Sequence, residues 1–163
     1  GSDLHSPEPG AADDDHRRLS KAADVRSLNL KQFEVAHARE EMGEEPVPGF
    51  YHHMAQMRVQ GMSWSAEVDG RIVASAGLVP LWQGVAEAWM ISADDVGRHQ
   101  IKVARQIRTM FDDVMWQRGI YRAQANIHHK FEKAIRLAEW LGFEQEGLMR
   151  RFGIEGDDYF RYA

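Results

Sequence analysis

The chain has 163 residues, a length that suits one domain with a single hydrophobic core. Its 25 acidic and 20 basic residues give a net charge of −5, which argues against non-specific nucleic-acid binding because that needs a surplus of Lys and Arg. There is no cysteine, so disulfides, thiol catalysis and cysteine-based zinc sites are excluded, and a reducing cytosol is the simplest compartment.

The most apolar and the most polar segments of the chain indicate how it is organised. The longest apolar stretch, residues 72–82, is interrupted by Ser, Gly and Pro and is too short to span a bilayer, and no secretory signal is visible. Residues 1–16 hold two Pro, two Gly and an Asp run with few apolar side chains. We therefore expect 1–16 to be a disordered leader or a cloning remnant, and 17–163 to form one domain.

The first expected elements are helical. Residues 28–42 carry apolar side chains at a spacing that predicts a short helix, and the acidic segment 43–49, with its Pro and Gly residues, ends it. A second helix is expected over 50–60, with Met54 and Met57 facing inward and Gly61 as its stop. A strand within 17–25 is a further expectation.

The middle of the chain changes to a strand pattern. Residues 62–68 alternate apolar with polar, and 71–79 form an extended apolar run. Asp69 and Gly70 lie between them, and two such runs joined by Asp-Gly predict a β-hairpin. A third strand over 84–92 is expected after a break at Pro80.

The second half alternates helices and strands. A long helix over 95–118 is predicted, with Asp94 or Asp95 as its cap and Gly119 as its end. A strand over 120–127, a helix over 129–141 and a hairpin of 144–154 with 157–162 follow. The buried face of the long helix over 95–118 should comprise Ile101, Ala104, Ile107, Phe111, Val114 and Met115. This order predicts an α/β protein with a mixed sheet and helices on its faces.

Two segments carry a family resemblance: Glu-Ala-Trp-Met-Ile-Ser-Ala-Asp-Asp-Val at 87–96, and Ala-Ile-Arg-Leu-Ala-Glu-Trp-Leu-Gly-Phe-Glu at 134–144. The second resembles the helix, Leu-Gly-Phe and strand that end GNAT N-acetyltransferases. The first is similar to the acetyltransferase-like internal virion proteins of short-tailed bacteriophages. The resemblance implies a GNAT-like fold, with about six or seven strands flanked by about four helices.

The same resemblance implies an acyl-CoA cofactor, such as acetyl-CoA, whose pyrophosphate sits at the N-terminus of the long helix. Gly97, Arg98 and His99 are the implied phosphate ligands. Typical members have a glycine-rich loop here, whereas this chain has Asp94 and Asp95, whose charges oppose a pyrophosphate. The strand edges at 90–92 (Met90, Ile91, Ser92) and at Ala125 and Asn126 would flank the pantetheine arm.

For catalysis the resemblance implies a carboxylate on the third strand, and Glu87 is the candidate base for an unknown amine acceptor. An outward-facing structural Glu is the alternative. Backbone N–H groups around Met90 and Ile91 would stabilise the oxyanion. The family's tyrosine acid is replaced by Ala138, so Tyr121, Tyr159 or Tyr162 would have to substitute. The family's Asn near the last helix is also displaced: Phe131 stands there.

Alternatives remain open. His52–His53 and His128–His129 are adjacent pairs without a third ligand at chelating spacing, so no metal site is predicted. The main hypothesis is an acyl-CoA-dependent N-acyltransferase in the cytoplasm. The rival is a non-catalytic phage virion or host-interaction protein, located in a host cytoplasm or a virion, with a protein partner there. A small-ligand sensor is a third hypothesis.

Overall fold

The computed structural model describes residues 28–94 and 96–163. The expected leader at 1–16 and the expected strand within 17–25 lie outside these ranges. Over the described residues the chain forms a mixed β-sheet with four α-helices and one short 3-10 helix. The elements are β1 (Leu28–Gln32), α2 (Val35–Met42), α3 (Phe50–Gln56), β2 (Ser63–Val68), β3 (Arg71–Trp82), β4 (Val85–Ser92), η1 (Gly97–His99), α4 (Gln100–Arg118), β5 (Arg122–His128), α5 (Glu132–Trp140), β6 (Gln145–Met149) and β7 (Tyr159–Tyr162).

The seven strands lie in the order β1-β2-β3-β4-β5-β7-β6, and only the β4–β5 pair is parallel. The predicted hairpin is confirmed: β2 and β3 pair antiparallel around a two-residue turn. Asp69 and Gly70 have φ of 51° and 77° in that turn. Left-handed backbone at both positions matches the right-handed twist of the flanking strands, which is why Asp-Gly favours it.

The first expected helix is wrong over its N-terminal third. Residues 28–32 form strand β1, which pairs with β2 from Leu28 opposite Val68 to Gln32 opposite Trp64. The alternating burial along β1 indicates a period of two, and only α2 keeps the helical period. A sheet edge was available at β2, and backbone pairing along it outweighs the local helical spacing.

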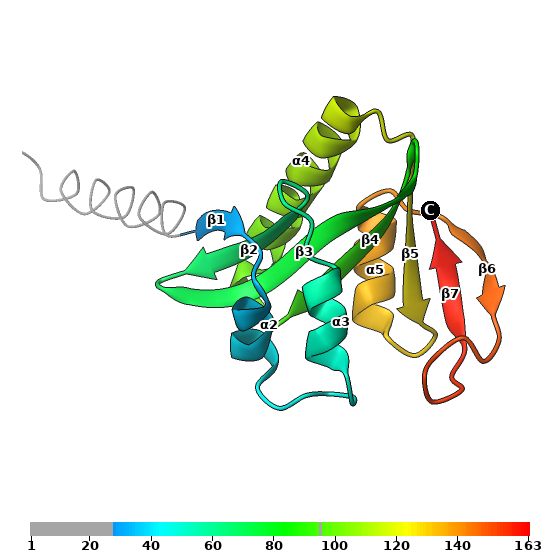
Figure 1. Ribbon diagram of the computed structural model, residues 1–163, viewed down its shortest axis with the longest axis horizontal. Helices are drawn as coiled ribbons and strands as arrows, with labels where there is room; N and C mark the ends of the chain where they lie inside the picture. Colours follow the sequence, from blue (N-terminus) through cyan, green and yellow to red (C-terminus); the bar gives the residue numbers. More distant parts are fainter. Residues whose placement is uncertain (1–27, 95) are drawn as a thin grey trace, which may run out of the picture.

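Two packed layers cover the sheet (Figure 1). On one face, α2 and α3 pack around Phe33, and Trp89 and Ile91 of β4 lie against this cluster. On the opposite face, α4 packs on the even-numbered positions of β4, such as Ala86 and Ala88. Helix α5 lies on the α4 side, because its residues pack with Ile127 and Tyr162. Alternation along β4 therefore directs Glu87 to the α2–α3 face.

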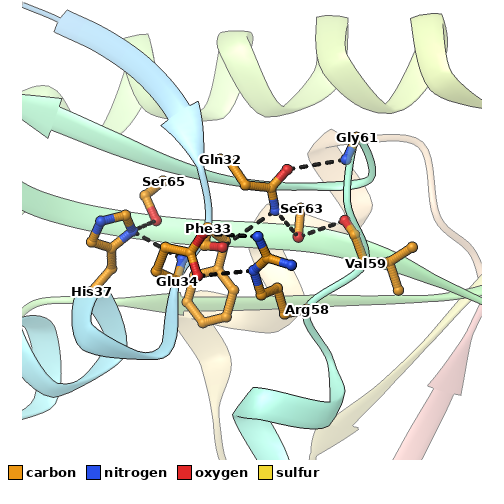
Figure 2. A network of polar contacts seen from close by, with 9 residues as sticks. All are labelled: Gln32, Phe33, Glu34, His37, Arg58, Val59, Gly61, Ser63 and Ser65. Carbon is orange, nitrogen blue, oxygen red and sulfur yellow. Dashed lines mark hydrogen bonds and ion pairs between the residues drawn. The ribbon is translucent and has the colours of Figure 1, made fainter.

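A polar network ties β1 and α2 to the rest of the sheet (Figure 2). The Gln32 side chain donates to Ser63 Oγ at 2.9 Å and accepts from the Gly61 backbone at 3.0 Å. The Glu34 carboxylate forms a two-pronged ion pair with the Arg58 guanidinium, with both contacts at 2.9 Å. These contacts join the start of α2 to the loop after α3, so they fix where both helices sit on the sheet.

Several predicted boundaries differ from the structure. Strand β3 continues through Pro80 to Trp82 instead of breaking, because Pro80 lies at a bulge where its missing N–H is tolerated. Helix α3 ends at Gln56, four residues before its expected end at residue 60. The last hairpin has a loop over 150–158 in place of a tight turn at 155–156.

The long helix also differs at its start. A 3-10 turn occupies 97–99, and α4 begins at Gln100 without a side-chain cap, so the role expected of Asp94 is not observed and Asp95 lies outside the described residues. Its predicted end is confirmed, because Gly119 has φ 64° and ψ 32°. Ile101 is 64% exposed, whereas Val103 is buried in its place in the stripe. No helix in the described ranges is long and apolar enough to cross a membrane.

Candidate active site

The sheet opens between its two parallel strands. β4 and β5 pair only at Val85–Arg122, Ala86–Ala123 and Glu87–Gln124. Beyond this point β5 pairs with β7 on its other side, while β4 runs on to Ser92, and the two strands separate (Figure 1). The edge of β4 that faces β5 therefore carries backbone groups without a strand partner from Ala88 onward, within the described chain.

Glu87 lies at the point of separation and is half-buried. Its Oε1 accepts a hydrogen bond of 2.6 Å from Asn126 Nδ2, and Asn126 Oδ1 accepts one of 2.8 Å from Arg161 Nε. The amide orientation follows from its neighbours, because a guanidinium only donates and a carboxylate only accepts. The three side chains form one line across β4, β5 and β7, with a negative charge at one end and a positive charge at the other.

The expected phosphate ligands follow β4 directly. Gly97 and His99 lie in the 3-10 turn that leads into α4, only a few residues after Ser92. Gly97 has φ 34°, and apart from its chain neighbours no heavy atom of the described residues lies within 4 Å of where its Cβ would be, so the space beside its backbone is open. The first turn of α4 contains no acidic residue. Asp94 is exposed just before this turn. The backbone therefore suits an anion, and Asp94 opposes it.

Ala138 stands where the resemblance implies a tyrosine acid, and it is part of a hydrophobic core cluster. Ala138 is buried beside Ile127 and Tyr162. The ring of Tyr162 is buried too, its hydroxyl donates to Gln145 Oε1 at 3.4 Å, and burial raises its pKa. Tyr121 is 77% exposed and precedes β5, at the end of the sheet where β4 and β5 are still paired.

Tyr159 is therefore the tyrosine of this chain that shares the Glu87 face within the sheet. It pairs with His128 in the β5–β7 ladder, and their rings meet edge to face at 5.3 Å. His128 Nε2 lies 3.4 Å from Asp157 Oδ2, and its Nδ1 accepts from the Lys130 backbone at 3.1 Å. Both nitrogens of His128 are thus engaged.

The adjacent pair His128–His129 is stacked, with ring centroids 4.8 Å apart. His128 is the last residue of β5, and the chain turns after it. No group of three His, Asp or Glu side chains suited to a metal ion occurs among the described residues.

Glu87 and Asn126 were predicted from the sequence as candidate site residues, and Arg161 was not. Asn126 was expected only beside the pantetheine arm, and its side chain instead joins Glu87 to Arg161. The sequence of the last strand contained a pattern that could have indicated Arg161. Tyr159 and Arg161 alternate with Phe160 and Tyr162, so Arg161 lies on the more polar face of the strand and Phe160 and Tyr162 lie on the opposite face. The partner strand could not be read from that pattern.

No protein-family model and no curated protein matches the sequence. Solved structures do match. The ribosomal-protein-S18-alanine N-acetyltransferase from Escherichia coli aligns with a TM-score of 0.66 and 17% identity, over 83% of this chain and 91% of that one. The protein has the GNAT acetyltransferase fold. A putative phosphinothricin N-acetyltransferase aligns with a TM-score of 0.63 and 20% identity, over 83% of this chain and 96% of that chain.

The GNAT acetyltransferase from Bacillus anthracis aligns similarly, with a TM-score of 0.62 and 13% identity over 83% and 93% of the two chains. The predicted fold class, a mixed sheet flanked by helices in the GNAT arrangement, is thus confirmed. At these identities the likeness concerns the GNAT fold, and the chemistry has to be argued from the site.

Proposed function

We propose that this protein is an acyl-CoA-dependent N-acyltransferase that acts on an amine. The observation that carries the proposal is the position of Glu87: a half-buried carboxylate where the two parallel strands of a GNAT fold separate, oriented by a 2.6 Å hydrogen bond from Asn126. Glu87 Oε2 has no hydrogen-bond partner among residues 28–94 and 96–163, so this oxygen is available to accept a proton.

Acetyl-CoA or another acyl-CoA is the proposed cofactor, and when bound it supplies an acyl group activated as a thioester. The open edge of β4 at Met90, Ile91 and Ser92 would hold its arm opposite Ala125 and Asn126. Gly97, Arg98 and His99 would hold its phosphates through the backbone and the dipole at the start of α4. The accessible Gly97 backbone supports this fit.

Glu87 would take a proton from the acceptor's ammonium nitrogen, directly or through one water, so that the nitrogen lone pair becomes available to form the amide C–N bond as the thioester C–S bond breaks. Asn126 keeps the carboxylate in position for that transfer. Backbone N–H groups on the open edge near Met90 and Ile91 are the proposed donors to the developing oxyanion. Tyr159 is the proposed source of the proton for the departing thiolate, since it lies on the Glu87 face.

The first test is thermal melting with millimolar acetyl-CoA, followed by a thiol-release assay with amine acceptors. Binding to the native state must raise the melting temperature by mass action. A shift of several degrees together with amine-dependent thiol release is expected. The concentration of 5 mM is roughly a hundredfold above a typical affinity in the tens of micromolar. An unchanged melting temperature at this concentration would contradict both the proposed cofactor and the proposed enzymatic function.

The rival function, a non-catalytic GNAT-fold protein of a phage particle or its host interaction, is favoured by two observations. Ala138 is buried in the core where the resemblance implies a catalytic tyrosine. Asp94 adds a negative charge beside the proposed phosphate site. This rival predicts neither a melting shift nor thiol release, so the same pair of measurements separates the two functions.

A further inference from the structure

We infer that the acceptor amine carries a carboxylate close to its nitrogen, as a free α-amino acid does, and that Arg161 binds this carboxylate. The inference rests on the proposed N-acyltransferase function and adds the substrate class. It depends on one juxtaposition: an arginine with no carboxylate of residues 28–94 and 96–163 at ion-pair distance, held on the same face of the sheet as Glu87 and joined to it through Asn126.

Arg161 is a half-buried cation with spare hydrogen-bonding capacity. Its Nε donates to Asn126 Oδ1 at 2.8 Å, and its Nη2 lies 3.4 Å from Met149 Sδ, a weak acceptor. A guanidinium has five N–H donors, so most of its charge-bearing edge is unused. No carboxylate of the described chain lies within ion-pair distance of it; the nearby Glu146, whose pKa the Arg161 charge helps to lower, is held by Arg122. A partly desolvated cation in this state is a ready partner for an anionic ligand.

Two other arginines of this chain, Arg122 on β5 and Arg58 in the loop after α3, each have a carboxylate partner. Arg122 holds both oxygens of the Glu146 carboxylate, at 2.8 and 2.5 Å. Arg58 holds both oxygens of Glu34, at 2.9 Å each. Arg161 faces a neutral amide in the place where these two face a carboxylate. Because Arg122 already holds Glu146, the guanidinium of Arg161 stays open to a carboxylate from outside the chain.

The geometry limits the length of the ligand. The Glu87 oxygen and the Arg161 Nε are linked through one amide group by contacts of 2.6 and 2.8 Å, so they lie no more than about 8 Å apart. An α-amino acid, whose nitrogen and carboxylate oxygens are roughly 3 Å apart, reaches both with a hydrogen bond at each end. A longer extended amino carboxylate overshoots this span.

The register supports simultaneous contact. Glu87 lies opposite Gln124 on β5, and Asn126 lies opposite Arg161 on β7. Alternation therefore directs Glu87, Asn126 and Arg161 to one face, the face that α2 and α3 cover over β3 and β4. In Figure 1 the strands β5, β7 and β6 extend beyond these two helices. A small zwitterion lying over Asn126 would place its ammonium at Glu87 and its carboxylate at Arg161.

The test compares each free amino acid with its own α-carboxamide, because the two differ only in the carboxylate. Glycine, alanine, methionine, phenylalanine, glutamate and lysine, with their amides, are assayed for thiol release from acetyl-CoA. We expect at least one free acid to exceed its amide in kcat/KM by on the order of 100-fold, mainly through KM. Arg161→Gln should remove this preference by raising KM for the acid alone, and Arg161→Lys should restore part of it.

The amide substrates control for a structural role of Arg161. If Arg161 only positions Asn126, its loss lowers turnover of acid and amide equally. Arg58→Gln is the matched arginine control, since its guanidinium is already paired with Glu34, and should leave the acid-over-amide ratio unchanged. A second readout needs no turnover: the free acids at 10 mM should raise the melting temperature of the wild type but not of Arg161→Gln.

The outcomes separate the two proposals. Acids and amides acetylated equally well, with Arg161→Gln preserving that equality, overturn the substrate class and leave the acyltransferase standing. Turnover of neither, with no melting shift by acetyl-CoA, overturns the acyltransferase. In that case a melting shift by free acids that is lost in Arg161→Gln still supports the carboxylate site, and its absence overturns that site as well.

Discussion

A methyl group added to Gly77 would lie 2.7 Å from Trp89 Nε1. The same methyl would meet the Met62 backbone oxygen and Ser63 Cβ at 2.9 Å each. Trp89 lies two residues after Glu87 on β4, and its buried indole N–H has no hydrogen-bond partner among residues 28–94 and 96–163. The close contact of β3 and this indole therefore fixes how β4 sits under α2 and α3.

Gly77→Ala is expected to destabilise the protein by about 1–3 kcal/mol, because overpacking against backbone cannot be relieved by a rotamer change. The measurement is the free energy of unfolding from denaturant titration. Gly147→Ala is the matched control: Gly147 also lies in a strand, and nothing lies within 4 Å of its Cβ position. Equal losses in the two variants would show that glycine content, and not the Trp89 contact, sets the cost.

Glu87→Gln is expected to lower kcat by about 10²- to 10⁴-fold, because the amide cannot accept the acceptor's proton. The melting shift by acetyl-CoA should persist, since Glu87 is not among the proposed cofactor ligands. Glu132→Gln, at an exposed carboxylate on α5, should retain full activity. Rates within twofold of wild type at every pH would remove Glu87 from the reaction.

Asp94→Asn is expected to tighten acetyl-CoA binding severalfold, since it removes a negative charge beside the proposed phosphate site. Isothermal titration at low salt measures the change, which should shrink as salt screens the charge. Asp113→Asn, at an exposed position towards the other end of α4, should have no effect. Weaker binding in Asp94→Asn would mean that this carboxylate supports the cofactor site.

Glu41, a buried carboxylate on α2, predicts a pH-dependent stability. Burial raises the pKa of Glu41 to about 8 from its ordinary 4.5, with the hydrogen bond from Ser75 as a smaller, opposing cause. Ser75 also contacts Ser65 at 2.9 Å, and Ser65 contacts His37 Nδ1 at 2.8 Å, so Glu41 ends a hydroxyl chain that begins at a half-buried histidine. Burial lowers the pKa of His37.

The pKa of Glu41 in the folded protein lies above its value in the unfolded chain. Its contribution to the free energy of unfolding is therefore fully present below pH 4.5 and is lost as pH rises through about 8. Glu41→Gln, which mimics the protonated acid, is expected to raise the melting temperature at pH 9 and to change it little at pH 5. Glu44→Gln, at an exposed carboxylate, should change neither. A Glu41→Gln variant with an unchanged stability difference between pH 5 and 9 would refute the assignment.

Local chemistry was enough to predict part of this fold. Asp69 and Gly70 determine the β2–β3 hairpin because the required left-handed backbone is a property of those two residues. Gly119 determines the end of α4 in the same way. The apolar stripe of α4 predicted a buried helix face, with Ile101 as its one exposed member. These signals act over a few residues, so the sequence alone expresses them.

The tertiary structure decided the rest. β1 is a strand because the edge of β2 offers it backbone partners, although its spacing is compatible with a helix. Asn126 meets Glu87 across 39 residues of sequence, and Arg161 meets Asn126 across 35, because β5 pairs with β4 on one side and β7 on the other. Sequence periodicity assigns each side chain to a face of its own strand. Only the order and register of the strands bring a carboxylate, an amide and a guanidinium into one line.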